Sequence, residues 1–411
     1  MTILLVATAD ALSSELPHEV YVWQRTWNEP VRAAIALARP QVAGMAVLGC
    51  EMAWRQQRSH VARTQIDYAA VRRTGLPVSL VLRVGPYQGT FAPDAPSTIV
   101  LSNLAVSLVV EAKSAGVPLK EIQIDFDSAE SKLDGYRVWV ESIRQRIAPV
   151  SLTITALPCW LRHDSFVRLA RAAGGYVLQV HSLERPASAD APMTLCDPIA
   201  ARRAVEQAAS VGVPFRVALP TYGYVAGFDS QNKLLGLSAE GPLLSWPMQT
   251  RLREVRADAT ELAGLVREWT DKIPAHLTGI IWYRLPTAGD TLNWRWPTLA
   301  AVMRGKIPQP ALRVEVRRPK PGLAEFELSN TGDADAVLPV IASTDCEGAS
   351  VESADALNGF EVVRESNTLV RFRGPLSATS HRLAPGEHKL IGWLRVKTEK
   401  EIKVYVVPLE N

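Results

Sequence analysis

The feature that most constrains this 411-residue chain is a regular alternation of short β-rich apolar runs with amphipathic helical stretches. Several helical stretches end in Gly followed by Val-Pro or Leu-Pro, a signal that ends a helix and leads directly into the next strand. Strands that alternate with helices at this spacing predict parallel βα units. Eight such runs occur, at residues 19–27, 41–49, 76–85, 121–128, 150–160, 176–183, 214–224 and 277–286.

Eight βα units in about 290 residues predict a closed (β/α)8 barrel, a fold that typically needs about 250 residues. A doubly wound open sheet is the alternative, but no Gly-rich phosphate-binding turn follows the first predicted strand. The expected helices lie at residues 30–37, 59–73, 99–115, 133–147, 164–173, 198–210 and 260–272.

Beyond a linker at residues 306–310 (KIPQP), the pattern changes to strands without helices. Seven short strands separated by turn signals predict an immunoglobulin-like β-sandwich over residues 311–411. These strands are expected at residues 312–318, 323–330, 337–344, 360–365, 368–373, 388–397 and 401–407. The complete prediction is a terminal arm or signal-peptide remnant (1–18), a barrel (19–305), the linker and the sandwich.

Composition excludes several classes of partner. The net charge is +3, from 45 basic and 42 acidic residues without a basic block, which argues against nucleic acid and anionic membranes as partners. No stretch approaches the roughly 20 apolar residues that a membrane span needs. The four widely spaced cysteines suggest neither a zinc cluster nor a disulfide framework, and we expect no metal and no cofactor. Localisation is periplasmic or secreted if residues 1–18 are a truncated signal peptide, and otherwise cytoplasmic.

The strongest chemical signal lies on the fourth predicted strand, in the run Ile122-Gln123-Ile124-Asp125-Phe126-Asp127. Residues two apart on a strand face the same side, so Asp125 and Asp127 should both point into the barrel mouth. Two neighbouring carboxylates shift one another's pKa, which suits an acid with an electrostatic partner. A helix cap would explain Asp127 but not Asp125 inside an apolar strand.

The other strand ends carry polar and aromatic groups of the kind that sugar rings require, namely flat apolar faces and hydrogen-bonding groups. A long connection after the seventh strand, residues 225–259, is also expected to be functional, because it lies at the carboxyl face where such barrels build their sites. The candidate substrate-binding residues are Trp23, Arg25, Glu51, Arg83, Gln179, His181, Tyr222, Trp282 and Arg284.

Three segments together resemble the family 18 chitinase group of glycoside hydrolases: IQIDFDSAE on the fourth strand, ALPTYGY on the seventh and GIIWYRL on the eighth. The chain as a whole is still more similar to a bacterial family known as domain of unknown function 3142. The resemblance to family 18 implies a carbohydrate substrate and an active-site Trp, which would be Trp282.

This chain departs from the chitinase pattern at the position of the catalytic acid, where Ala129 stands in place of Glu and Glu130 comes one residue late. Three outcomes remain open: Asp127 serves as the acid, Glu130 or Glu51 replaces it, or the barrel binds glycans without hydrolysing them. We expect a glycoside hydrolase-like protein acting on a bacterial or amino-sugar-containing glycan, with Asp127 as acid and Asp125 as electrostatic partner. The alternative is a lectin-like glycan-binding protein on the same barrel.

Overall fold

The computed structural model describes residues 16–55, 58–182, 186–239, 245–338, 340–346, 348–374, 382–398 and 400–408. Most of the predicted terminal arm therefore lies outside the described residues. The chain divides into two compact units. The first comprises residues 1–182, 196–220 and 265–285, and the second comprises residues 183–195, 221–264 and 286–411. The boundary predicted at residues 306–310 remains a prediction.

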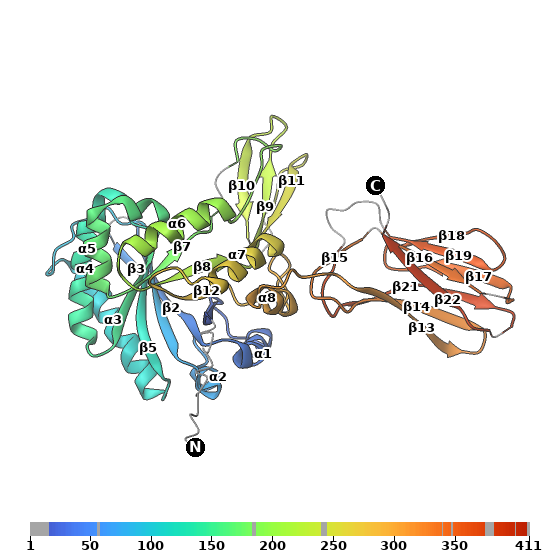
Figure 1. Cartoon of the computed structure of the whole chain (residues 1–411), viewed down its shortest axis with the longest axis horizontal. Coiled ribbons are helices and arrows are strands. Elements are labelled where there is room, and N and C mark those ends of the chain that lie inside the picture. Colours follow the sequence, from blue (N-terminus) through green and yellow to red (C-terminus); the bar gives the residue numbers. More distant parts are fainter. Residues whose placement is uncertain are drawn as a thin grey trace, which may run out of the picture. The chain divides into compact units, whose positions relative to one another are not determined.

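Eight parallel strands form the closed barrel that the sequence predicts, since the first strand pairs with both the second and the last. Figure 1 shows these strands at the centre of the first unit, with α3, α4 and α5 on the outside. The barrel strands are β1 (His18–Val22), β2 (Gly44–Arg55), β4 (Val78–Val84), β5 (Leu119–Phe126), β6 (Ser151–Ala156), β7 (Tyr176–Gln179), β8 (Phe215–Pro220) and β12 (Leu277–Tyr283).

The helices follow from local stop and start signals. Asp67 caps α2 by accepting a hydrogen bond from the Ala70 amide (2.9 Å), and α5 ends at Gly174, whose φ of 85° is left-handed. The helices are α1 (Glu29–Ala38), α2 (Tyr68–Thr74), α3 (Pro96–Ser114), α4 (Leu133–Ile147), α5 (Asp164–Ala173), α6 (Pro198–Ser210), α7 (Ala259–Asp271) and α8 (Trp296–Met303). Short 3₁₀ turns occur at η1 (Arg39–Gln41), η2 (Glu130–Lys132) and η3 (Pro158–Arg162).

One predicted element is wrong. Residues 59–73 do not form a single helix, because β2 continues to Arg55 and pairs antiparallel with β3 (Arg58–Arg63) before α2 begins. Every residue of β3 is exposed, so neither of its faces shows the apolar alternation that identifies a strand in sequence.

Two layers fill the barrel below its mouth. A layer of buried, mostly aliphatic side chains crosses the middle and consists of Tyr21, Ala46, Val81, Val177, Ala218 and Ile281. Beneath it, the Arg216 guanidinium donates to the carboxylates of Glu19 and Glu121, and Lys120 donates to Glu19 (2.6 Å). Arg216, Glu19 and Glu121 are all buried, and we call them the Arg216 cluster. Each of these buried charges has an oppositely charged partner.

The long connection after β8 forms a separate three-stranded antiparallel sheet in the second unit, made of β9 (Gly223–Phe228), β10 (Leu234–Ser238) and β11 (Arg251–Arg256) with β9 in the centre. Its small core contains Ala226 and Phe228, against which Leu234 and Leu237 pack. The strand predicted to run to residue 224 ends earlier, at Pro220.

The C-terminal region contains two four-stranded antiparallel sheets consistent with the predicted sandwich. They enclose an apolar core in which the rings of Phe326 and Phe372 lie 5.2 Å apart. One sheet contains β13 (Leu312–Lys320), β14 (Leu323–Asn330), β21 (His388–Val396) and β17 (Val351–Ala356). The other contains β18 (Glu361–Arg364), β19 (Leu369–Arg373), β16 (Val340–Asp345) and β22 (Lys403–Pro408), and β15 (Ala336–Val337) pairs with β20 (Arg382–Leu383). The sequence did not predict β17, because only Val351 of its six residues is buried.

All four cysteines are free, and no helix in the described part of the chain is both long and apolar enough to cross a membrane.

Candidate functional site

The mouth of the barrel brings together polar residues from three neighbouring strands. The parallel register pairs Glu51 with Arg83 and Arg83 with Asp125. A register shift between Leu48 and Cys50 sets Glu51 opposite Arg83, so these three residues share one face. The site therefore depends on the pairing of β2, β4 and β5.

Asp125 is fixed on both carboxylate oxygens. The Arg83 guanidinium donates to Oδ2 (2.7 Å) and the Thr155 hydroxyl donates to Oδ1 (2.8 Å). Asp125 is only 5% exposed, and this burial raises its pKa above the usual range, although Arg83 opposes the effect. The neighbouring charge of Asp127 raises the pKa further. The Asp125 carboxyl group is therefore placed to influence a neighbouring group and not to contact solvent.

Asp127 lies one residue beyond the end of β5 and is exposed. Within the described residues its carboxylate takes part in no hydrogen bond or ion pair. Its effect on the pKa of Asp125 shows that the two carboxylates interact, as the i, i+2 spacing predicts. Asp127 is thus the carboxylate at this strand end that is free to meet a ligand.

Arg83 connects Asp125 to the rest of the mouth. Its guanidinium carbon lies 5.7 Å from the centroid of the Trp23 ring, and its Nε lies 4.0 Å from Glu51 Oε1. Glu51 in turn accepts two hydrogen bonds from Arg25, at 2.6 and 3.0 Å. The four predicted residues Trp23, Arg25, Glu51 and Arg83 therefore form one connected group.

An aromatic cluster lies beside this group. The Trp23 and Tyr283 rings meet edge to face at 5.2 Å, and His181 stacks on Tyr283 at 5.6 Å. Gln179 donates to the backbone carbonyl of His181 (3.2 Å). His181 is 6% exposed, and burial lowers its pKa to about 3, so its imidazole is neutral at ordinary pH. The cluster offers apolar ring surface, and its histidine carries no charge.

The assignment of Trp282 as a sugar platform is contradicted. Trp282 is fully buried, and its indole N–H donates to His18 Nδ1 (3.1 Å). Strand alternation places Ile281 in the barrel interior, so its neighbour Trp282 points outward and Tyr283 points inward. The i, i+2 relation between Ile281 and Tyr283 was the signal in the sequence that would have identified Tyr283.

Glu130 is also corrected as a candidate acid. It lies in η2, where Arg162 donates to its Oε2 (2.8 Å) and His163 Nε2 contacts the same oxygen. Hydrogen bonds from Arg162 and then from His163 lower the pKa of Glu130 to about 2. A carboxylate held ionised in this way is unsuited to donating a proton.

Two further predicted site residues, Arg284 and Tyr222, lie outside the connected group and the aromatic cluster described above. Arg284 is half-buried and follows Tyr283 through a cis peptide bond. Tyr222 belongs to the second compact unit, where its ring packs edge to face against Tyr224 at 5.3 Å. In the described part of the chain, no group of three or more His, Cys, Asp or Glu side chains could hold a metal ion.

A comparison of the sequence with models of known protein families identifies the family of this chain. A model described as domain of unknown function (DUF3142) matches residues 74–288, just over half of the sequence. The chain belongs to the DUF3142 family. A second model, domain of unknown function (DUF8456), matches residues 313–397. No curated protein matches the sequence.

Solved structures share the fold of this DUF3142 barrel. The spore cortex-lytic enzyme SleL of Bacillus cereus aligns with a TM-score of 0.51 at 13% identity, covering 71% of this chain and 74% of that chain. SleL of Bacillus megaterium aligns with a TM-score of 0.50 at 12% identity and the same coverage. A chitinase from Chromobacterium violaceum aligns at 0.49 with 14% identity, covering 71% of this chain and 98% of that chain. The barrel of this DUF3142 chain thus shares its fold with the two SleL enzymes.

Proposed function

We propose that the chain is a glycoside hydrolase-like protein that acts on a glycan containing 2-acetamido sugars, with Asp127 as the acid and Asp125 as its electrostatic partner. The observation that carries this proposal is the contrast between the two carboxylates. Asp125 is buried and bonded on both oxygens, whereas Asp127 is exposed at the strand end without a bonding partner in the described residues.

The number of available carboxylates supports substrate-assisted chemistry. Most glycosidases use two carboxyl groups that flank the scissile bond, one as acid and one as base or nucleophile. Here Glu51 is paired with Arg25, and Glu130 is paired with Arg162. Of the three candidate acids Asp127, Glu130 and Glu51, Asp127 is then the one without an ion pair in the described residues, and the 2-acetamido group of the substrate would supply the nucleophile.

In this reaction, protonated Asp127 gives its proton to the glycosidic oxygen as the bond between that oxygen and the anomeric carbon breaks. The acetamido oxygen forms a new bond to the anomeric carbon, and the nitrogen of the resulting ring becomes positively charged. The Asp125 carboxyl group steadies the acetamido group. Water then attacks the anomeric carbon as the bond from that carbon to the acetamido oxygen breaks, which restores the neutral acetamido group, and ionised Asp127 takes the proton that the water loses.

A second candidate is glycan binding without turnover, and one observation favours it. Ala129 stands where the resemblance to family 18 expects the catalytic Glu, and the nearby Glu130 is held in its ion pair. The aromatic cluster of Trp23 and Tyr283 would still supply a surface for sugar rings.

The test measures hydrolysis of chromogenic 2-acetamido oligosaccharides and of bacterial cell-wall glycans by the full chain. We expect Asp127→Asn to lower kcat by roughly 10²–10⁴-fold, the usual contribution of a general acid, and Asp127→Glu to retain part of the activity. Glu130→Gln is the matched control, because the same charge is removed from a carboxylate outside the reaction. Equal activity in the parent protein and Asp127→Asn would exclude Asp127 as the acid. Tight binding by the parent protein without turnover of any glycan would establish the second candidate.

A further inference from the structure

The amino-terminal face of the barrel, opposite the candidate site, carries a concentration of positive charge. Helices of a (β/α)8 barrel run antiparallel to the strands, so their carboxyl ends gather at this face. The last turns of four consecutive helices, α2 to α5, contribute six basic residues. We call these residues the basic rim: Arg72, Arg73, Lys113, Arg144, Arg146 and Arg171.

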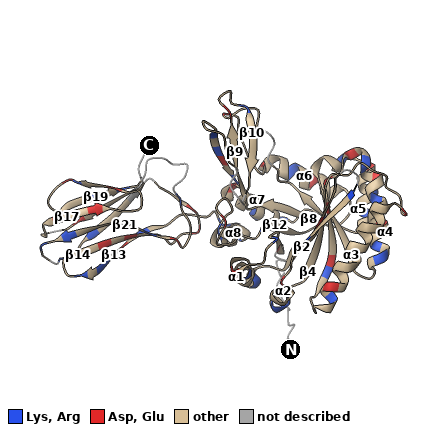
Figure 2. Ribbon diagram, turned by 180° about the vertical axis from the view of Figure 1, so that it is seen from behind, with Lys and Arg blue, Asp and Glu red and all other residues tan. Residues whose placement is uncertain are grey.

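Rim residues connect neighbouring helix ends in two places. Arg72 on α2 donates to the Ala115 carbonyl after α3 (3.4 Å), and Arg144 on α4 donates to the Ala172 carbonyl of α5 (2.7 Å). Just before this arc, Arg39 reaches the Thr74 carbonyl at the end of α2 in the same way (2.8 Å). Figure 2 shows the basic ends of α2 and α3 in blue.

Charge is not balanced within the rim. The acidic residue in these last turns is Glu111, and it is already paired with Arg63 (2.5 Å). All six rim residues are exposed, and Arg73, Lys113, Arg146 and Arg171 form no hydrogen bond or ion pair in this described stretch. The chain as a whole is only +3, so the rim represents a segregation of charge and not a general surplus.

Stabilisation of helix dipoles does not account for this distribution. A cation at a helix carboxyl end is favourable by about 0.3–1 kcal/mol, and the same benefit would be available to every helix of the barrel. The last turns of α6 and α7 contain no basic residue, and Asp271 ends α7. Among the eight α-helices of the described residues, basic residues in the last turn occur in α2 to α5 and not in α1, α6, α7 or α8.

The strand starts beside this arc contain a cleft of about 630 Å³. Lys120 and Arg144 line it, together with the buried Arg216 cluster and the backbone of Gly174 and Gly175. The glycine pair adds no side chain, which leaves room for a ligand group to approach. Arg144 is the rim residue that lines this cleft, so a concave site adjoins the open surface at that end of the rim.

We propose that the basic rim binds an anionic polysaccharide, a glycan chain that bears carboxylate, sulfate or phosphate groups. Four adjacent helix ends spaced by roughly 10 Å extend over roughly 30 Å, which suits an extended polymer and not a single small anion. No exposed aromatic side chain lies in these last turns, so stacking with nucleic acid bases has no platform there. The surface also lacks the broad apolar face with which amphipathic helices enter a membrane.

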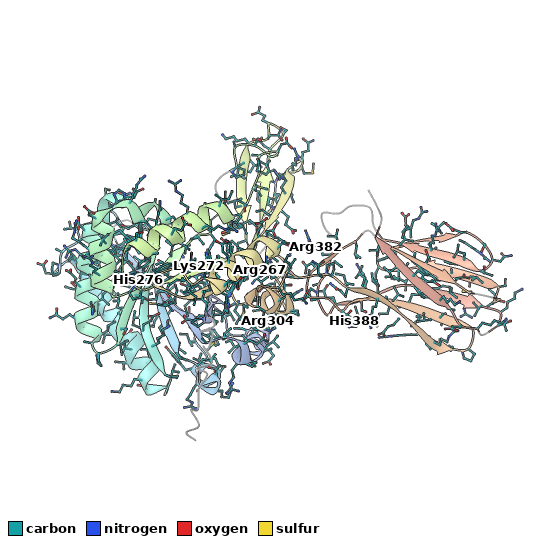
Figure 3. The ribbon with its side chains drawn as sticks, in the orientation of Figure 1. Arg267, Lys272, His276, Arg304, Arg382 and His388 are labelled. Carbon is teal, nitrogen blue, oxygen red and sulfur yellow. The ribbon has the colours of Figure 1, made fainter. Side chains whose placement is uncertain are left out.

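The experiment compares the full chain with two charge-reversal variants of equal net charge. Arg146→Glu/Arg171→Glu alters the rim at two exposed residues without bonded partners. Arg267→Glu/Lys272→Glu makes the same change on the α7 arc, where Figure 3 labels both side chains. Affinity for dextran sulfate and polygalacturonate is measured at several salt concentrations, with neutral dextran as the control polymer.

We expect the parent protein to bind both anionic polymers but not dextran, with an affinity that falls steeply as salt rises. The rim variant should bind roughly tenfold more weakly or worse, and the α7 variant should change by less than about twofold, given the usual contribution of a basic residue near an anionic surface. A second rim variant, Arg73→Glu/Lys113→Glu, should repeat the loss.

Equal losses in the rim and α7 variants would overturn the proposal, as would the absence of binding by the parent protein. Tighter binding to double-stranded DNA or to phosphatidylglycerol vesicles, at equal charge concentration, would refute the polysaccharide assignment. Asp127→Asn should bind the anionic polymers as the parent does. Polymer binding by the basic rim and hydrolysis by Asp127 can therefore be tested separately, because they depend on different residues.

Discussion

His181 should make the stability of the barrel depend on pH in a way that can be calculated. Its ring is buried against Tyr283, and burial lowers its pKa to about 3 in the folded protein. In the unfolded chain the pKa returns to about 6.5. Because the folded pKa is depressed, the folded state excludes a proton that the unfolded state accepts. The stability is therefore fully present above pH 6.5 and is lost as the pH falls toward 3.

The magnitude follows from these two pKa values. Linkage between pH 7 and pH 4.5 gives a loss of about 2.5 kcal/mol in the free energy of unfolding from this one residue. The loss is set mainly by the unfolded pKa, because pH 4.5 lies below the unfolded value and above the folded one. Carboxylates titrate in the same range, so the quantity to measure is the difference between the parent protein and His181→Gln.

The assay is urea unfolding at pH 7 and pH 4.5, followed by tryptophan fluorescence. Trp139, Trp160 and Trp282 are fully buried in the first unit, so their emission reports on the barrel. The parent protein should lose about 2.5 kcal/mol more than His181→Gln over this interval. His60→Gln, at an exposed position on β3, should follow the parent. Parallel pH profiles for the parent and His181→Gln would show that His181 does not cause the loss of stability.

Three further predictions concern a buried ion-pair cluster and two glycines. Arg216→Met should cost about 3–5 kcal/mol, because two buried glutamates lose their shared cation, and replacing both glutamates by Gln as well should recover most of the loss in the same urea assay. Gly392→Ala should destabilise the C-terminal sandwich by about 1–3 kcal/mol, because a Cβ there would overlap the ring of Phe372. This change is measured by the thermal unfolding of the sandwich. Gly264→Ala should have the opposite sign and stabilise α7 by up to about 1 kcal/mol in thermal unfolding, since a Cβ at this position meets nothing within 4 Å.

The barrel could be predicted because its strands are buried on both faces. Runs such as 78–84 are almost continuously apolar, and helix stops such as Gly75 (φ 69°) and Gly174 (φ 85°) follow a local rule of backbone sterics. The β2–β3 extension and β17 lack this burial. Their backbone pairs with a neighbouring strand, and pairing between strands leaves no periodic signal in sequence when most side chains are exposed.

The candidate site shows where a sequence pattern is sufficient and where it is not. The i, i+2 spacing of Asp125 and Asp127 depends on strand geometry alone, and the interaction between the two carboxylates followed from it. The roles of the flanking residues depend on partners distant in sequence. Glu130 becomes a paired base only because η3 brings Arg162 to it, across 32 residues. No local sequence pattern indicates that Arg162 will lie beside Glu130.

The opposite orientations of the Trp282 and Tyr283 side chains could have been predicted from the sequence. Their order on the strand sets one outward and one inward, but a motif-based alignment selects the residue type and not the face. Ile281 fixes the phase of this strand by its place in the barrel layer, so Tyr283 must share that face. A Tyr283→Ala variant should therefore weaken glycan binding at the mouth, whereas a loss seen with Trp282→Ala should reflect a cavity in the barrel wall. Equilibrium binding and urea unfolding of both variants separate the two effects. If Trp282→Ala weakened glycan binding at unchanged stability, Trp282 and not Tyr283 would be the residue that contacts the glycan.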